Sequence, residues 1–388
     1  MPTINILMKD FVVWDSTGDY LLDLSKHLGT PWFGSARIVT QLSLPDGLLN
    51  RPQKKVLIVP WWRYDHPPVD YSWADLVVCY TRELIHEDWN TYLAKSIENF
   101  NTDRLIFVMG GKISSAPTDP RLFCPLLGFF HCTVMANDVH EYDITKSRPY
   151  LFDAMLGIMR RNRAYVFNRL VEDGLLDQSL VSIMQDPFNS YQVNPSNTYY
   201  RSVNEYTSPA LEYLDDPSVH KFKQSATTIK ELYSANIVTD RFYKGKVKRP
   251  VQMSQIIPVE VYKNSWFSIV VKTNPSDFDF LTEKTAKPIM ARRIFVVFGS
   301  QGILAFLRQQ GFRTFDGLID ESYDQEPNEL KRYDMAWQQI RRLAECDPVQ
   351  MYQQAQPVLE HNFNTLMDCT RKNFLDLQRF IKSHTDRL

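Results

Sequence analysis

Residues 266–302 read WFSIVVKTNPSDFDFLTEKTAKPIMARRIFVVFGSQG, a run that alternates apolar and amphipathic segments. Residues 267–271 and 294–298 have the length and the apolar, β-branched content of buried strands. A helix is expected between them, opened by Thr282 with Glu283 in its first turn. A second helix is expected to start at residues 299–302. Two successive strand-to-helix junctions therefore face one edge of a parallel sheet, where open α/β sheets bind their ligands.

The first half of the chain shows the same alternation. Its strand candidates are residues 4–8, 37–42, 56–60, 76–80, 105–109 and 132–135, and residues 82–99 predict a crossover helix. Because one core rarely grows beyond about 250–300 residues, a chain of 388 residues predicts two domains. We expect an α/β fold with two Rossmann-like domains, 1–145 and 150–345, followed by a helical segment over 346–388 that packs across both domains.

In the second half, residues 146–152 are predicted to link the domains. A helix over residues 165–176 is expected to close at Gly174, and strands are expected at 180–183 and 259–261. Residues 184–236 show no regular period and predict mainly loop. The final segment predicts one long amphipathic helix with a single apolar stripe, made of Phe363, Leu366, Met367, Thr370, Phe374, Leu377 and Ile381.

The net charge and the cysteine spacing limit the classes of protein to which this chain can belong. Lys and Arg number 44 against 45 Asp and Glu, so the net charge of −1 provides no overall field for nucleic acid or an anionic membrane. None of the five cysteines is spaced as CxxC, which favours incidental thiols in a reducing compartment and no metal site. No window approaches about 18 apolar residues, and no signal-like run opens the chain. These patterns predict a cytoplasmic protein without a membrane span.

Glu283 and Lys284 stand together at the start of the expected helix, with Lys287 one turn further on. Helix N-termini favour anions because their first N–H groups are unpaired and the dipole adds roughly half a positive charge. A glycosyl donor requires a carboxylate for its ribose hydroxyls and cations for its diphosphate leaving group. The pair supplies one of each. The alternative is a capping pair of Thr282 and Glu283 beside a solvated lysine.

These residues resemble the GT-B fucosyltransferases and related bacterial and phage glycosyltransferases. The signature of that family runs Glu-Asn-Ser, a short gap and Tyr-Val-Thr-Glu-Lys. The chain keeps the spacing of nine residues from Asn to Glu and carries Thr273-Asn274-Pro275 and then Phe280-Leu281-Thr282-Glu283-Lys284. The resemblance implies that Glu283 binds the ribose and Lys284 the phosphates, with Phe280 at the position of the nucleotide-binding Tyr. Thr273, Pro275 and Phe280 differ from the signature, which leaves the base and the sugar open.

The resemblance also implies a GT-B fold, in which two domains face a central cleft. The implied reaction is a metal-independent, inverting transfer of a sugar from a nucleotide-diphosphate sugar to a hydroxyl acceptor such as a glycan, with no cofactor. Family members carry an essential Arg after an apolar strand of the second domain. Arg163 is the first choice for that role and Arg160 the second, since guanidinium groups bind phosphate oxygens in pairs. The alternative is a basic cluster on the surface.

An inverting transferase also needs a general base for the acceptor hydroxyl. In GT-B proteins it comes from a loop of the first domain, and residues 61–71 combine aromatic rings with titratable groups. Asp65 or His66 is the candidate base; the alternative is a packed aromatic loop.

The most basic run, residues 241–249, places aromatic rings among its cations. It leaves a modified DNA base open as a less favoured acceptor, or it is a solvated loop. A non-catalytic protein that binds nucleotides or glycans is the remaining alternative to a transferase.

Overall fold

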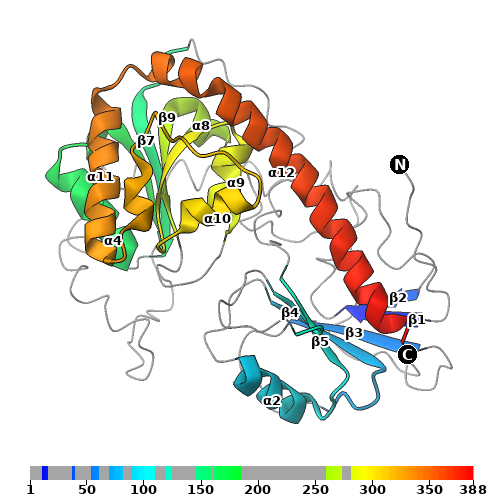
Figure 1. The fold of residues 1–388 in the computed structure, drawn as a ribbon. Helices are drawn as coiled ribbons and strands as arrows, with labels where there is room; N and C mark the ends of the chain where they lie inside the picture. Colours follow the sequence, from blue (N-terminus) through cyan, green and yellow to red (C-terminus); the bar gives the residue numbers. More distant parts are fainter. Residues whose placement is uncertain are drawn as a thin grey trace. The chain divides into compact units, whose positions relative to one another are not determined.

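A computed structural model of the chain describes residues 11–15, 37–39, 54–60, 70–81, 89–109, 119–124, 146–158, 161–184, 259–272 and 281–387. The chain divides into two compact units (Figure 1). One comprises Met1–Phe130, Phe278–Leu281 and Met367–Leu388, and the other His131–Asp277 and Thr282–Leu366. Each unit contains a small parallel sheet with helices, which agrees with the expected two-domain α/β class.

Among the described residues, the sheet of the first unit has six parallel strands in the order β2-β1-β3-β4-β5-β6. They are β1 (Phe11–Asp15), β2 (Arg37–Val39), β3 (Lys54–Pro60), β4 (Leu76–Thr81), β5 (Leu105–Met109) and β6 (Leu122–Phe123). The predictions of β2 to β5 are confirmed, although the termini differ by up to three residues. β1 and β6 were not predicted, and the predicted strands at 4–8 and 132–135 lie outside the described residues.

Helix α2 (Trp89–Phe100) confirms the predicted crossover helix between β4 and β5. Trp89 and Tyr92 are buried on its inner face, and their rings lie 5.1 and 5.6 Å from that of Phe107 on β5. These ring contacts pack α2 on the sheet, as expected for an amphipathic crossover helix.

In the second unit, the described strands form one parallel sheet in the order β10-β9-β7-β8. They are β7 (Tyr150–Ile158), β8 (Ser179–Met184), β9 (Ser265–Val271) and β10 (Ile294–Phe298). The chain enters at β7, adds β8 on one side and then adds β9 and β10 on the other. The winding therefore reverses between β7 and β9, and doubly wound sheets bind ligands outside the carboxyl ends of the strands at such a point.

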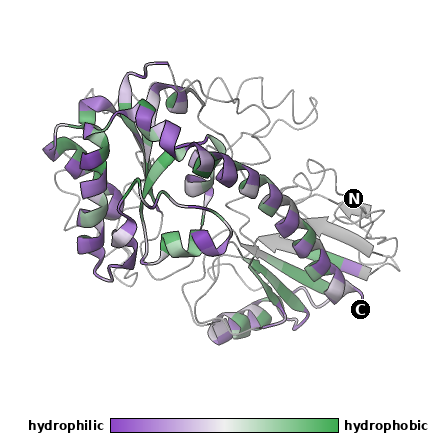
Figure 2. Cartoon of the chain, turned by 45° about the horizontal axis from the view of Figure 1, so that its top comes forward, coloured by the Kyte–Doolittle hydropathy of each residue, from purple (hydrophilic) through white to green (hydrophobic). Residues whose placement is uncertain are grey.

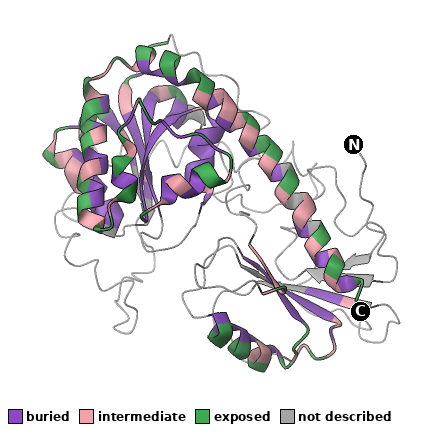
Figure 3. Ribbon diagram, viewed as in Figure 1, coloured by how far each residue is buried: buried purple, intermediate pink, exposed green. Residues whose placement is uncertain are grey.

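Helices cover both faces of this sheet, with α4 and α11 on one side and α9 and α10 on the other (Figure 1). Every residue of β9 and β10 is buried (Figure 3). β10 consists of hydrophobic residues and β9 of mainly hydrophobic ones (Figure 2), as expected for parallel strands between two layers. The helical segments are α4 (Arg161–Glu172), η2 (Leu176–Gln178), α8 (Val259–Asn264), α9 (Glu283–Met290), α10 (Ile303–Gln309), η6 (Glu321–Gln325), α11 (Glu329–Glu345) and α12 (Pro348–Thr385).

Three sequence predictions for this half are wrong. Residues 146–152 are not simply a linker, because the central strand β7 begins at Tyr150. Residues 259–261 open helix α8 rather than forming a strand, since three residues are too few to separate the two periods. Met367 does not belong to the buried stripe of α12: it is 39% exposed while its neighbour Leu366 is fully buried, and adjacent helical side chains point about 100° apart.

The close of α4 is confirmed, because Gly174 adopts a left-handed φ of 66° just beyond the helix. The predicted loop at 184–236 lies outside the described residues beyond Met184. No helix in the described part of the chain is both long and apolar enough to cross a membrane.

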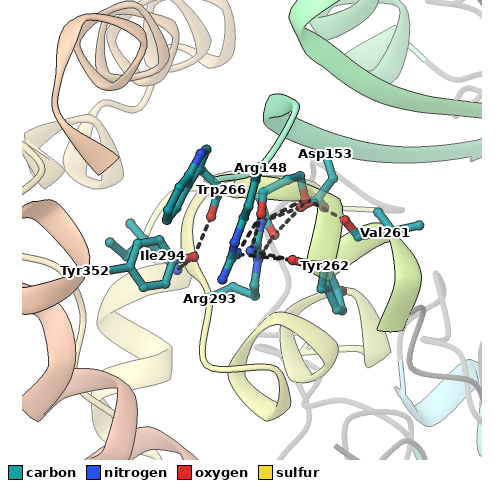
Figure 4. A network of polar contacts seen from close by, with 10 residues as sticks. Arg148, Asp153, Val261, Tyr262, Trp266, Arg293, Ile294 and Tyr352 are labelled. Atoms are coloured by element: carbon teal, nitrogen blue, oxygen red, sulfur yellow. Dashed lines mark hydrogen bonds and ion pairs between the residues drawn. The ribbon is translucent and has the colours of Figure 1, made fainter. Parts of the chain in front are cut away.

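A buried ion pair joins the amino ends of β7 and β10 (Figure 4). Arg293 Nη2 donates to Asp153 Oδ2 at 3.0 Å, and the Ser265 and Ser268 hydroxyls of β9 donate to the same oxygen at 2.9 and 2.8 Å. Burial raises the pKa of Asp153, while the charge of Arg293 and the two hydroxyls act in the opposite direction. The carboxylate thus connects three strands.

A second guanidinium, that of Arg148, lies beside this pair. Arg148 and Arg293 each donate to the carbonyl oxygens of Tyr262 and Ser265, at distances from 2.6 to 3.1 Å. These carbonyls lie at the C-terminal end of α8, where backbone acceptors have no helical partner and the dipole is negative. Arg148 also stacks on the Trp266 ring, 4.6 Å from its centre. Both arginines therefore find acceptors although they are buried.

We predict that Arg293→Met lowers the free energy of unfolding by about 3–5 kcal/mol, because it leaves the Asp153 carboxylate buried without its cation. Urea unfolding measures the loss. Arg341→Met is the control, since Arg341 pairs with Asp173 at the surface and is 43% exposed, and should change stability by about 1 kcal/mol or less. Equal effects of the two substitutions would contradict this role of the pair.

Candidate functional site

The candidate site lies at the carboxyl edge of β7, β9 and β10. Asn162, in the first turn of α4, is fully buried, and its Nδ2 donates to the backbone carbonyl of Lys272 at 2.7 Å. Lys272 directly follows β9, so this bond connects the ends of the two strands between which the winding reverses. The Asn162 Oδ1 atom is also buried, and no group in the described part of the chain donates a hydrogen bond to it.

Lys272 is a buried lysine, with only 3% of its surface exposed. Its Nζ donates to the Thr285 hydroxyl in α9 at 2.7 Å, and its backbone N–H donates to the carbonyl of Phe298 in β10. Burial, together with the positive charge of Lys284, lowers the pKa of Lys272 to about 7, with Glu283 acting in the opposite direction. Lys272 therefore changes charge near neutral pH.

Gly299, at the end of β10, allows Lys272 to lie this close. A Cβ atom at position 299 would be 3.0 Å from Lys272 Cγ, which is shorter than an ordinary carbon contact of about 3.5–4.0 Å. The Gly299 carbonyl in turn accepts a hydrogen bond from Arg332 Nε of α11 at 3.0 Å. Any larger residue at position 299 must displace the lysine side chain or the strand end.

The start of α9 carries the residues that the sequence singled out. Thr282 is the N-cap, and its hydroxyl accepts from the Lys284 N–H at 3.3 Å. Lys284 Nζ donates to Glu283 Oε1 at 2.7 Å, and the two side chains are 25% and 18% exposed. Burial alone raises the pKa of Glu283, but Lys284 and Lys287 outweigh it and lower the pKa to about 2. Glu283 is therefore ionised throughout the neutral range.

The helix that follows β10 does not offer its N-terminus to a ligand. Its Leu304 and Ala305 N–H groups donate to the two carboxylate oxygens of Asp324 at 2.9 and 3.0 Å. A carboxylate of the chain itself thus occupies the start of α10. The prediction that a helix starts at residues 299–302 is confirmed, because Gly302 is the N-cap of α10. The expectation that this helix start is open to an anionic ligand is wrong, because Asp324 already supplies a carboxylate there.

The structure brings together Thr282, Glu283, Lys284 and Lys287 in α9, next to Lys272. Thr282 does cap the helix, but Lys284 is in an ion pair and only partly exposed rather than solvated. Arg163 is buried, with 3% of its surface exposed, in the first turn of α4, so it does not belong to a solvated basic face. The remaining predicted residues lie outside the described part of the chain: Asp65, His66, Arg160, Asn274 and Phe280.

Sequence reasoning missed Asn162 and Lys272 as site residues. The signal was weak but present: Asn162 lies within the Arg-Arg-Asn-Arg run after β7, and Lys272 is the first polar residue after the apolar β9. Each follows one of the two strands that flank the reversal of winding. Recognising the strand order from the sequence would have placed both at the ligand-binding edge.

Neither a group of metal ligands among the described residues nor a known relative indicates the function of this site. In the described part of the chain, no group of three or more His, Cys, Asp or Glu side chains is arranged to hold a metal ion. Comparisons with protein-family models, curated proteins and solved structures found no match to this chain. The function must therefore be inferred from the site residues.

The contact between Gly299 and Lys272 is testable by a double-mutant cycle. Gly299→Ala should destabilise the protein by about 1–3 kcal/mol, because the added methyl group overpacks the Lys272 side chain. In the background of Lys272→Ala, which lacks the Cγ atom, the same substitution should cost much less. Urea unfolding of the four proteins gives the coupling, and additive effects would exclude this contact as the reason for the glycine.

The pH dependence of stability tests the state of Lys272. From about pH 7 to 10.5, Lys272 is protonated in the unfolded chain and deprotonated in the folded chain. The free energy of unfolding should therefore rise with pH over that window. Below it, both states are protonated and the full penalty for burying the charge remains. Lys272→Met should therefore be more stable than the wild type at pH 6 by on the order of a few kcal/mol, and the difference should vanish toward pH 10.5.

Urea midpoints of both proteins across this range measure the difference. Lys331→Met is the control, because Lys331 is 68% exposed. A difference between wild type and Lys272→Met that does not change with pH would show that Lys272 keeps an ordinary pKa.

Proposed function

We propose that this chain is a glycosyltransferase that moves a sugar from a nucleotide-diphosphate sugar to a hydroxyl acceptor such as a glycan. One observation carries the proposal. A single carboxylate, that of Glu283, interacts electrostatically with three lysines, Lys272, Lys284 and Lys287. They lie at the edge of the sheet where the winding reverses. An excess of cations beside one ionised carboxylate suits a ligand that carries both phosphates and hydroxyls.

The lysines have a role in the reaction itself. As the glycosidic bond breaks, the diphosphate leaving group gains negative charge, and positioned cations stabilise that charge in the transition state. The ammonium groups of Lys284 and Lys287 are assigned this role. The proposal therefore gives side chains the task that a metal ion has in other transferases.

Glu283 is assigned to the ribose. A carboxylate has about four acceptor positions on its two oxygens, so it can keep its bond from Lys284 and still accept from a ribose hydroxyl. The depressed pKa of Glu283, about 2, keeps it in the acceptor form. Arg163 and Arg160 would add guanidinium donors for the phosphates, and Asp65 or His66 would take the acceptor proton.

The GT-B arrangement and inversion belong to the same proposal. They rest on the resemblance of residues 274–284 to the fucosyltransferase signature. Neither the sugar nor the base of the nucleotide is assigned, since Thr273, Pro275 and Phe280 depart from that signature.

The proposal is tested by donor binding and turnover. The wild type should be stabilised by a nucleoside diphosphate or its sugar ester in a thermal-shift series over GDP, UDP, ADP and CDP, with a shift that grows with the logarithm of concentration. With the donor so identified and a set of glycan acceptors, release of the nucleoside diphosphate reports transfer. Glu283→Gln and Lys284→Met should each reduce turnover by about 10²-fold.

Two surface substitutions in α11 serve as matched controls. Glu345→Gln and Lys331→Met change the same residue types at exposed positions and should leave turnover as in the wild type. A wild-type protein that neither binds nor consumes any of these donors, or site variants that retain full turnover, would rule out the proposal.

A further inference from the structure

The buried ammonium of Lys272 lacks an ion-pair partner among the described residues. Its hydrogen-bond acceptor is the neutral Thr285 hydroxyl, and the nearby carboxylate of Glu283 is bonded to Lys284 at 2.7 Å. Removing a charge from water without a counter-charge is costly, and buried charges are normally paired. The interior of this unit follows that rule at its other end, where Arg293 is paired with Asp153.

The backbone nevertheless holds Lys272 firmly in this position. Its N–H is bonded to Phe298 in β10 and its carbonyl to Asn162 in α4, while Gly299 leaves room for its side chain. Residues at the carboxyl ends of three strands, β7, β9 and β10, thus fix the position of this one lysine. An apolar side chain would fill the same space without the cost of burying a charge, so the placement calls for a functional reason.

A second observation points to a ligand at the same place. Asn162 Oδ1 is a buried acceptor to which no described group donates, and leaving such an atom unsatisfied costs about 1–3 kcal/mol. The same carboxamide is bonded through Nδ2 to the Lys272 carbonyl. A buried cation without a counter-charge and a buried acceptor without a donor therefore belong to two residues that are hydrogen-bonded to each other at the carboxyl ends of β7 and β9.

We propose that Lys272 and Asn162 form an inner subsite for a phosphate-bearing ligand, in which the Lys272 ammonium binds a phosphate oxygen and Asn162 Oδ1 accepts a hydrogen bond from a ligand hydroxyl. Lys284, which is more exposed and whose charge acts on Lys272, is the outer cation of the same site. Two cations at different depths match two successive phosphates. The inference rests on the proposed function only in assigning those phosphates to a sugar nucleotide.

The test uses inorganic pyrophosphate, which carries the phosphates without sugar or base, and isothermal titration calorimetry on the full chain. Lys272→Met should weaken pyrophosphate binding by about tenfold or more, the loss of one charge-assisted hydrogen bond, while raising the urea midpoint at neutral pH. A lysine with a purely structural role would not combine weaker anion binding with higher stability. Lys331→Met should bind pyrophosphate as the wild type does.

Gly299→Ala gives a second variant that keeps every charge and crowds the lysine side chain, because the added Cβ would lie 3.0 Å from Lys272 Cγ. It should weaken pyrophosphate binding severalfold, and the double variant Gly299→Ala with Lys272→Met should bind no more weakly than Lys272→Met alone. The inference is overturned if Lys272→Met binds pyrophosphate with wild-type affinity, or if the wild type binds no pyrophosphate.

Failure of this inference is distinguishable from failure of the proposed function. If sugar-nucleotide turnover depends on Lys284 but not on Lys272, the transferase stands and the inner subsite falls. If pyrophosphate binding depends on Lys272 but no sugar nucleotide is consumed, the subsite stands and the transferase falls.

Discussion

The buried pairing of Arg293 with Asp153 is the interaction on which the second unit depends. It lies at the amino ends of β7, β9 and β10, where hydroxyls from Ser265 and Ser268 complete the hydrogen bonding of the carboxylate. Charged groups are tolerated in a protein interior when each has a counter-charge and good hydrogen bonds. Arg148 and Arg293 also donate to backbone carbonyls at the end of α8, so both buried guanidinium groups at this edge have acceptors within the unit.

The opposite edge of the same sheet is built differently. There Lys272 is buried with only a hydroxyl as its acceptor, and Asn162 keeps one buried oxygen to which no described group donates. The two edges differ in whether the chain supplies a counter-charge to its buried cation: Arg293 has the Asp153 carboxylate, and Lys272 has the neutral Thr285 hydroxyl. Buried charges are normally paired, and exceptions to this rule are found at functional sites more often than elsewhere. This asymmetry is the reason for proposing a ligand site at the carboxyl edge.

The position of Asp324 explains why the junction before α9 is a candidate site and the junction before α10 is not. Both α9 and α10 begin at the carboxyl edge of the sheet, and both helix starts favour a negative charge. At α10 the chain brings its own carboxylate to the first N–H groups, and this interaction belongs to the fold. At α9 the first turn carries Glu283 and Lys284 instead, beside a further buried lysine. At α9, three lysines, Lys272, Lys284 and Lys287, interact electrostatically with the one carboxylate of Glu283.

The local pattern of apolar and polar residues was sufficient to predict most of the helices and strands. The apolar runs of β4, β5, β9 and β10 and the helix opened by Thr282 follow from residues adjacent in the chain, because burial on both faces requires continuous hydrophobic strands and capping depends on nearest neighbours. The pattern of apolar residues gave the wrong element at residues 259–261, because the sequence Val-Glu-Val is short enough to fit a strand as well as a helix. It also failed at β7, which continues directly from a polar, proline-containing segment.

The amino-acid sequence sufficed to single out Glu283, Lys284 and the arginine run after β7, because charge and position at a helix start are local properties. Only the tertiary structure revealed that Lys272 is buried, that Asn162 bonds its backbone, that Gly299 makes room for it and that Asp324 occupies the neighbouring helix start. Each of these facts joins residues from different junctions of the sheet. The order of parallel strands, which brings such residues together, is decided by packing across the whole unit and not by any one segment.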